Sequence, residues 1–191
     1  MDVELLKDEG NYNIDRLRTI VLVEGDHNQN GKHLGKNAMR MATDSQCTSA
    51  NAPEQYGSKK YHRAIEVVLN SRLIDDILRQ RRQPGVICLN DAVSCYDRIV
   101  HSVFSMCLAR IGSRDTAVQS SIETLQSLCH HVRTAFGDSD ASYTGTSEKP
   151  LQGLVQGYGP APAGWALISP PIINMMREFG FGFGSDPQII I

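Results

Sequence analysis

The sequence predicts an α+β fold in which helices pack on one face of a small antiparallel sheet. Short β-branched runs bounded by turn residues, at 16–23 and 86–90, predict strands. Longer segments with an apolar residue every three or four positions, such as 61–81 and 99–111, predict helices. A polar Gly-Asp-Ser-Asp turn within 132–151 predicts a hairpin, so the sheet is expected to form around 86–90 and this hairpin.

Composition limits the class of protein. The chain has 191 residues, of which 41% are hydrophobic, and this excludes a disordered chain, a collagen and a disulfide miniprotein. Its five cysteines are odd in number and form no Cys-x-x-Cys pair, which predicts reduced thiols inside a cell. The acidic N-terminus does not resemble a signal peptide, and no run approaches the ~18 apolar residues of a membrane span. We therefore expect an intracellular protein of the cytoplasm or nucleus, without a membrane.

The N-terminal part is expected to begin with a tail over 1–13. The strand at 16–23 follows, then a polar turn over 26–31 and a helix over 32–42. A connector rich in Ser, Thr, Asn and Pro then leads to Pro53.

Next comes a helix over 61–81, which Pro84-Gly85 ends. The strand at 86–90 is expected to be buried, with Asp91 at its exit. The helix and its approach hold the basic excess of a chain whose formal net charge is −2. Such a density suits phosphate contact, although a solvated helix face is the commoner meaning. The basic residues are Lys59, Lys60, Arg63, Arg72, Arg79, Arg81 and Arg82.

In the C-terminal part, the helix at 99–111 closes at Gly112, and a second helix follows from about 115 to 132. Beyond the hairpin, a glycine-dense loop at 151–164 leads into a helix that is expected to kink at Pro170-Pro171. Residues 187–191 are expected to start a further strand.

Two segments carry candidate chemistry. The first is Asp91, four residues, then Tyr96-Asp97; a carboxylate at a strand exit suits a divalent cation, although on spacing alone an Asp that caps the next turn is favoured. The second is Gly153-Leu-Val-Gln156-Gly157, whose glycines allow backbone to approach a substrate while a glutamine hydrogen-bonds it. A glycine-rich loop alone is weak evidence, and the Gly-Lys-Ser/Thr of a phosphate-binding loop is absent.

Together and in this order, the two segments resemble reverse transcriptases of the retrotransposon type. Residues 91–97 are similar to the palm motif A of that family, Asp, four residues, aromatic, Asp, with its strand from 86. Residues 151–165 are similar to motif B, Gly-x-x-Gln-Gly before a Pro-containing helix start. Residues 54–60 resemble the fingers segment Gln-x-Gly-Phe-Arg, and the resemblance covers roughly 14–180.

The resemblance implies an RNA-directed DNA polymerase that uses Mg²⁺ (or Mn²⁺), an RNA template, a DNA primer and dNTPs. Asp91 would be a catalytic metal ligand, with the backbone carbonyl of Ala92 as a second oxygen. Tyr96 would exclude the 2′-hydroxyl of the incoming sugar, and Gln156 and Gly157 would line the nucleotide pocket.

The resemblance also implies nucleic-acid contacts and a domain layout. The basic residues at 59–82, of which Lys59, Lys60 and Arg63 come first, would face template phosphates. Residues 14–85 would be a fingers-like region and 86–191 a partial palm of a right-hand polymerase.

The departures from the family are as informative as the matches. No aromatic-x-Asp-Asp sequence follows motif B before Ile191, so motif C, with its metal-binding carboxylate, is missing, as is the thumb. Ser58 replaces the usual aromatic residue, and the residues that hold the triphosphate cannot be assigned. We therefore expect a fragment that is inactive alone. The alternatives are a non-catalytic nucleic-acid-binding remnant or an inert fragment of a mobile element.

Overall fold

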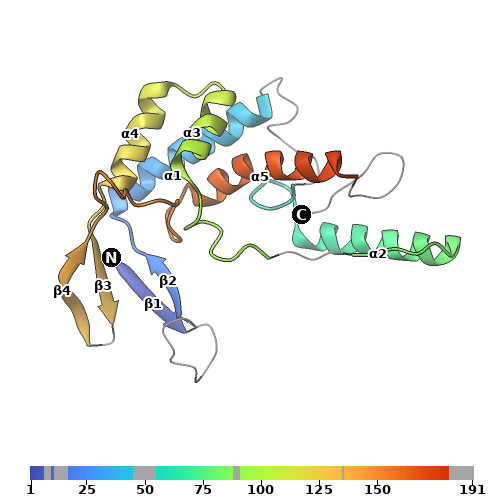
Figure 1. Ribbon diagram of the computed structural model, residues 1–191, viewed down its shortest axis with the longest axis horizontal. Coiled ribbons are helices and arrows are strands. Elements are labelled where there is room, and N and C mark those ends of the chain that lie inside the picture. Colours follow the sequence, from blue (N-terminus) through green and yellow to red (C-terminus); the bar gives the residue numbers. More distant parts are fainter. Residues whose placement is uncertain (7–9, 11–16, 45–54, 88–90, 135, 181–191) are drawn as a thin grey trace.

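The computed structural model describes residues 1–6, 10, 17–44, 55–87, 91–134 and 136–180. Within them the fold is α+β, as expected, with a helical core at whose end a small sheet lies (Figure 1). One helix projects away from this core on the opposite side from the sheet. The helices are α1 (Gly25–Asp44), α2 (Ala64–Arg81), α3 (His101–Arg110), α4 (Asp115–Gln126) and α5 (Ala161–Glu178).

The sheet has four strands in the order β2-β1-β3-β4. The expected strand at 16–23 is β2 (Leu17–Val21), and the expected hairpin is β3 (His130–Thr134) with β4 (Gly137–Tyr143). The expected tail at 1–13 is wrong in part, because β1 (Asp2–Leu6) pairs with strands on both sides. Since β1 and β3 run parallel, the sheet is mixed and not purely antiparallel.

The hydrophobic core is formed by helices packed on one another and on the glycine-dense loop. The expectation that helices cover the sheet is therefore wrong, because the main buried cluster of the described residues draws nothing from a strand. The hairpin strands β3 and β4 in particular are too polar to offer an apolar face to a helix. The cluster contains Ala38, Ala42, Ile99, Phe104, Cys107, Leu108, Ile111, Val118, Leu125, Leu154, Tyr158, Ala161 and Leu167.

Helix α1 begins earlier than its sequence predicts, since 26–31 is helical and not a turn. Its buried face consists only of small residues, Gly31, Gly35, Ala38 and Ala42, which repeat at helical spacing. A side chain at Gly35 would lie 3.0 Å from Pro160, so the small residues allow α1 to pack closely against the start of α5. That tertiary contact favours helix over the turn preference of the polar residues.

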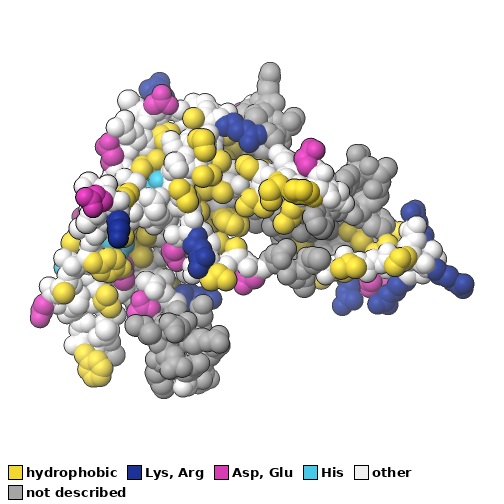
Figure 2. Space-filling model, in the orientation of Figure 1, with side chains coloured by type: hydrophobic (Ala, Val, Ile, Leu, Met, Phe, Trp, Pro, Cys, Tyr) yellow, Lys and Arg dark blue, Asp and Glu magenta, His cyan; other side chains and the backbone are white. Residues whose placement is uncertain are grey.

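Helix α2 keeps its predicted boundaries within a few residues but buries none of its side chains. Ile65, Leu69 and Leu73 are 56%, 55% and 59% exposed, and they contribute to the apolar patches on the projecting arm (Figure 2).

The start of the buried strand expected at 86–90 does not form a strand in the structure. Val86 and Ile87 belong to no strand and are 89% and 62% exposed. The remainder of that prediction, and the strand expected at 187–191, lie outside the described residues.

No helix in the described ranges combines the length and the hydrophobicity that a membrane crossing requires.

Candidate functional site

The two segments that the sequence singled out lie side by side. The N–H of Gly153 donates to the carbonyl of Ile99, and the N–H of Leu154 donates to the carbonyl of Tyr96, both at 2.9 Å. Ile99 and Tyr96 flank the end of the turn over 93–98 that follows Asp91. The fold therefore joins the turn after Asp91 to the glycine loop, although the two are far apart in the sequence.

Gly153 allows this close approach. Its φ is +95°, and a Cβ at this position would lie 2.7 Å from the carbonyl oxygen of Asp97 and 2.8 Å from the Asp97 Cα. Since both neighbours are backbone atoms, they cannot move aside as a side chain would. Only glycine fits here without strain.

The loop is fixed to the sheet at Gln156 and Gly157. The carbonyl of Gln156 accepts the N–H of Val21, the last residue of β2, at 2.7 Å. A Cβ on Gly157, whose φ is +110°, would clash with the carbonyl oxygen of Val21. The predicted pocket residues Gln156 and Gly157 are thus attached to β2 through their backbone.

Asp97 also binds Gln156. The backbone N–H of Gln156 donates to the Asp97 carboxylate, while the Gln156 carbonyl accepts from β2. Partial burial raises the pKa of Asp97, and this hydrogen bond opposes part of the rise. The residue as a whole remains exposed to solvent. Tyr96 beside it is half-buried against the core, and burial raises its pKa too.

The far end of the loop is attached to the start of α1. The N–H of Gly159 donates to the Asn28 Oδ1 at 2.7 Å, and the rings of His27 and Tyr158 stack with centroids 5.3 Å apart. Tyr158 is 4% exposed and covers Gly31. The loop over 151–160 is therefore held at both ends and in the middle.

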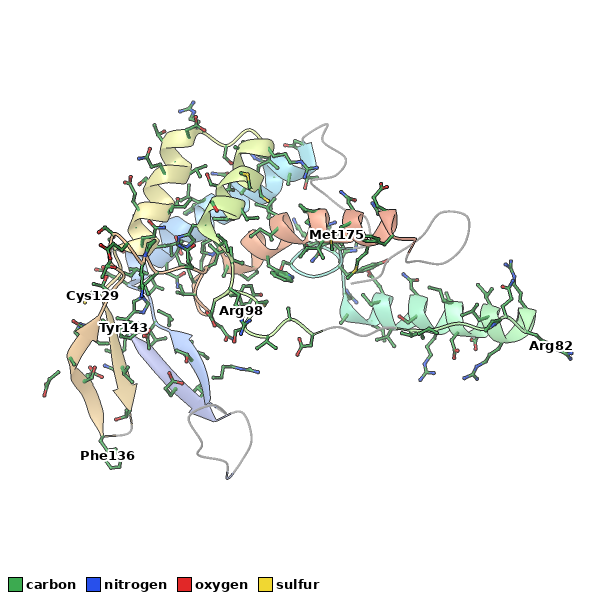
Figure 3. The ribbon with its side chains drawn as sticks, viewed as in Figure 1. Arg82, Arg98, Cys129, Phe136, Tyr143 and Met175 are labelled. Atoms are coloured by element: carbon green, nitrogen blue, oxygen red, sulfur yellow. The ribbon has the colours of Figure 1, made fainter. Side chains whose placement is uncertain are left out.

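Asp91 and Ala92 are both exposed, on the stretch that leads from the region of α2 into the turn at 93–98. Beside Ala92 lies an open groove of about 490 Å³, lined mostly by apolar residues that include Val93, Val103, Trp165 and Ile172. Among the described residues that line it, Arg98 is the charged one, and Figure 3 labels it. The groove suits an apolar group better than a triphosphate.

The ligand set fails the test for a two-magnesium site. Within the described part of the chain, no three His, Cys, Asp or Glu side chains come close enough to hold a metal ion. Magnesium prefers several oxygen ligands in octahedral geometry, and Asp91 supplies one carboxylate. The described residues therefore do not by themselves form the magnesium pair that the resemblance implies.

The segment over 55–63, which contains the predicted nucleic-acid contacts Lys59, Lys60 and Arg63, lies against α5. The Ser169 hydroxyl, about two turns from the start of α5, donates to the Gln55 Oε1 at 2.8 Å. Lys60 and Arg63 are exposed and Lys59 is half-buried, all within the short stretch that connects Gln55 to α2. The segment is thus bound to the middle of α5. The glycine loop lies at the start of the same helix, so the two predicted contact regions are at different positions along α5.

Comparison with protein-family models, with curated proteins and with solved structures found no match to this chain.

Sequence reasoning missed three residues of this site. Asp97 accepts a hydrogen bond from the loop at Gln156. The His101 Nε2 lies 2.8 Å from the carbonyl oxygen of Gly153, and Gln152 accepts the backbone N–H of His101. Asp97 was noticed as part of a motif but received no role, because its spacing does not reveal that it reaches Gln156. His101 and Gln152 had no signal at all, since a single histidine or glutamine has no periodicity and becomes informative only when its partners are known.

Proposed function

We propose that this chain is the fingers and partial palm of an RNA-directed DNA polymerase, which in its full-length context adds dNTPs to a primer on an RNA template. Alone, the chain is expected to be inactive. The proposal begins with the resemblance of residues 91–97 and 151–165 to motifs A and B of reverse transcriptases.

One observation carries the proposal. A nucleotide site in such a polymerase needs motif A and motif B side by side, and here Gly153 and Leu154 hydrogen-bond to Ile99 and Tyr96. Only glycine permits so close an approach at Gly153, so the fold holds the two segments together as a shared nucleotide site would require.

The proposed roles are those that the resemblance to reverse transcriptases implies. Gln156 and Gly157 line the pocket of the incoming nucleotide, and Tyr96 excludes its 2′-hydroxyl. Asp91 and the carbonyl of Ala92 would bind Mg²⁺ or Mn²⁺ together with carboxylates that the described part of this chain does not bring beside them.

Nucleotide binding tests the proposal without requiring catalysis. Trp165 is the only tryptophan and lies in the first turns of α5, directly after the loop, so its fluorescence reports on this region. We expect dUTP to bind at least tenfold more tightly than UTP, which differs from it only by the 2′-hydroxyl; a tenfold ratio is about 1.4 kcal/mol. Tyr96→Val should remove most of this difference, whereas Tyr61→Val, at a tyrosine that is 84% exposed, should not.

Equal affinity for dUTP and UTP, or no binding of either, would contradict the proposal. Primer extension by the same chain is expected to give no product. Template-dependent synthesis that Asp91→Ala abolishes would instead show that the chain is active alone.

A second candidate function, nucleic-acid binding without catalysis, is favoured by the surface of α2. Its last turn and C-cap carry Arg79, Arg81 and Arg82, all exposed, at the tip of the projecting arm (Figures 2 and 3). Arg79 also pairs with Asp75 at 3.1 Å, so Arg81 and Arg82 are the better candidates for phosphate contact.

Titration of labelled single-stranded RNA at about 50 mM and 200 mM salt tests this candidate. Two lost phosphate contacts in an Arg81→Gln, Arg82→Gln double variant should flatten the salt dependence by about 1.4 in log K against log salt. The double variant Arg114→Gln, Lys149→Gln, which removes two exposed charges elsewhere, is the control. Equal slopes in both double variants would exclude the arm as the RNA contact.

A further inference from the structure

The buried histidine at the start of α3 uses every polar group that it has. His101 is 3% exposed, and its Nε2 lies 2.8 Å from the carbonyl oxygen of Gly153. A carbonyl oxygen can only accept, so Nε2 carries the proton and donates. Nδ1 then accepts from the Gln126 side-chain amide of α4, at 3.0 Å.

The main chain of His101 is equally engaged. As the first residue of α3, it has an N–H without a partner inside the helix, and Val100 before it supplies no capping side chain. The Gln152 Oε1 accepts this N–H at 2.8 Å. Gln152 thus caps α3, while the His101 ring binds the carbonyl of the next loop residue.

These contacts fix both sides of Gly153. The Gly153 N–H donates to the carbonyl of Ile99, and the Gly153 carbonyl accepts from the His101 ring. Both backbone polar groups of Gly153 are therefore bound, by two residues that lie on either side of Val100. Leu154, which follows, is 1% exposed in the core. The direction in which the chain leaves toward Gln156 is therefore set at Gly153.

We infer that His101 is a positioning residue of the nucleotide site, which orients the loop over 153–157 by holding the Gly153 carbonyl, while Gln126 orients its ring. The inference rests on the proposed function of that loop. His101 acts through Gly153 and does not itself touch the nucleotide.

Two substitutions distinguish the hydrogen bond of His101 from its contribution to core packing. His101→Leu keeps much of the volume but removes the donor to Gly153, whereas His101→Gln keeps an N–H of similar reach. Val118→Ala, at a buried apolar residue of α4 whose side chain makes no hydrogen bond, serves as a control for lost stability. All three are made in the full chain and compared under conditions of equal global stability.

Amide hydrogen exchange of Gly153 and Gln156 is the first readout, and dTTP binding followed by Trp165 fluorescence is the second. In His101→Leu we expect exchange at both amides to be at least tenfold faster and dTTP affinity to be at least tenfold weaker. In His101→Gln both should stay within about threefold of the wild type, a difference below about 0.7 kcal/mol. Val118→Ala should change neither after correction for stability.

Unchanged loop exchange in His101→Leu would overturn the inference, whether or not dTTP binds. Equal weakening of dTTP binding in His101→Leu and Val118→Ala would overturn it as well. Faster loop exchange in His101→Leu, in a protein whose wild type binds no dTTP, would instead refute the proposed function and leave the hold of His101 on the loop intact.

Discussion

At the scale of single residues, the glycine loop depends on backbone conformations that side chains disfavour. Gly153 and Gly112 have similar left-handed φ values, +95° and +85°, but different surroundings. A Cβ on Gly153 would meet the backbone of Asp97, whereas one on Gly112 would touch only the end of the Met41 side chain at 3.8 Å. The pair therefore separates backbone strain from steric clash.

Gly153→Ala is expected to lower the free energy of unfolding by about 2–5 kcal/mol, because clash adds to strain. Gly112→Ala should cost about 1–2 kcal/mol, from strain alone. Urea unfolding measures both. Equal losses would mean that the loop does not approach Asp97 as closely as described.

Asp97 should make stability depend on pH. Its pKa in the folded protein is raised, so between the ordinary pKa of an aspartate and this raised value the folded state binds more protons than the unfolded state. Its contribution to stability is therefore largest at low pH and falls as pH rises through that window. Asp97→Asn keeps an acceptor for the Gln156 N–H but cannot ionise.

We expect the stability of Asp97→Asn, relative to wild type, to increase as pH rises from below the ordinary aspartate pKa to neutrality. Chemical denaturation at a series of pH values measures this difference. Asp76→Asn, at an exposed carboxylate of α2, is the control and should show no such trend. A difference that shrinks toward neutral pH would contradict partial burial of Asp97.

At this scale the sequence singled out candidate residues but not their contacts. Tyr96, Gln156 and Gly157 stand out from sequence because aromatic and glycine residues at fixed spacing are unusual. His101 does not, because its role comes from Gly153 and Gln126, which reach it only after α4 and the loop have packed.

At the scale of elements, periodicity predicted the helices but not their burial. Helix α2 has apolar residues at helical spacing, as an amphipathic core helix does, and still leaves Ile65, Leu69 and Leu73 exposed. Periodicity reports which residues share a face, and it cannot report whether another element covers that face. The early start of α1 has the same origin, since its contacts with Tyr158 and Pro160 outweigh local turn preference.

A matched pair of leucines tests the exposure of α2. Leu73→Ala is expected to change the free energy of unfolding by less than about 0.5 kcal/mol, because the side chain is already in water. Leu125→Ala, at a leucine of α4 that is 4% exposed, should cost about 2–5 kcal/mol. A loss of more than about 1 kcal/mol for Leu73→Ala would indicate that α2 packs against another surface in solution.

At the scale of the whole molecule, the beginning of the chain is joined to the hairpin that follows α4. Asp2 on β1 is 1% exposed, and it accepts from the His130 Nδ1 at 3.0 Å and from the hydroxyl of Tyr143. Burial and the hydrogen bond to Asp2 raise the pKa of Tyr143. A buried polar cluster thus joins β1 to the two polar strands of the hairpin.

Tyr143→Phe should lower the free energy of unfolding by about 1–3 kcal/mol, because it leaves an oxygen of buried Asp2 without its donor. Amide exchange in β1 should become faster in this variant. Tyr61→Phe, at a tyrosine that is 84% exposed, should have no measurable effect. Loss of stability without faster exchange in β1 would contradict a role for the cluster in joining β1 to the hairpin.

By itself, the sequence determined the α+β class, the positions of most helices, the strand β2, the hairpin, and the two segments that carry the candidate chemistry. These depend on local periodicity, turn residues and spacing, which are written along the chain. Only the tertiary structure decided that β1 joins the sheet, that α2 projects, and that Gly153 meets Asp97 and His101. Each of these depends on contacts between residues far apart in sequence, whose free energy exists only once the chain has folded.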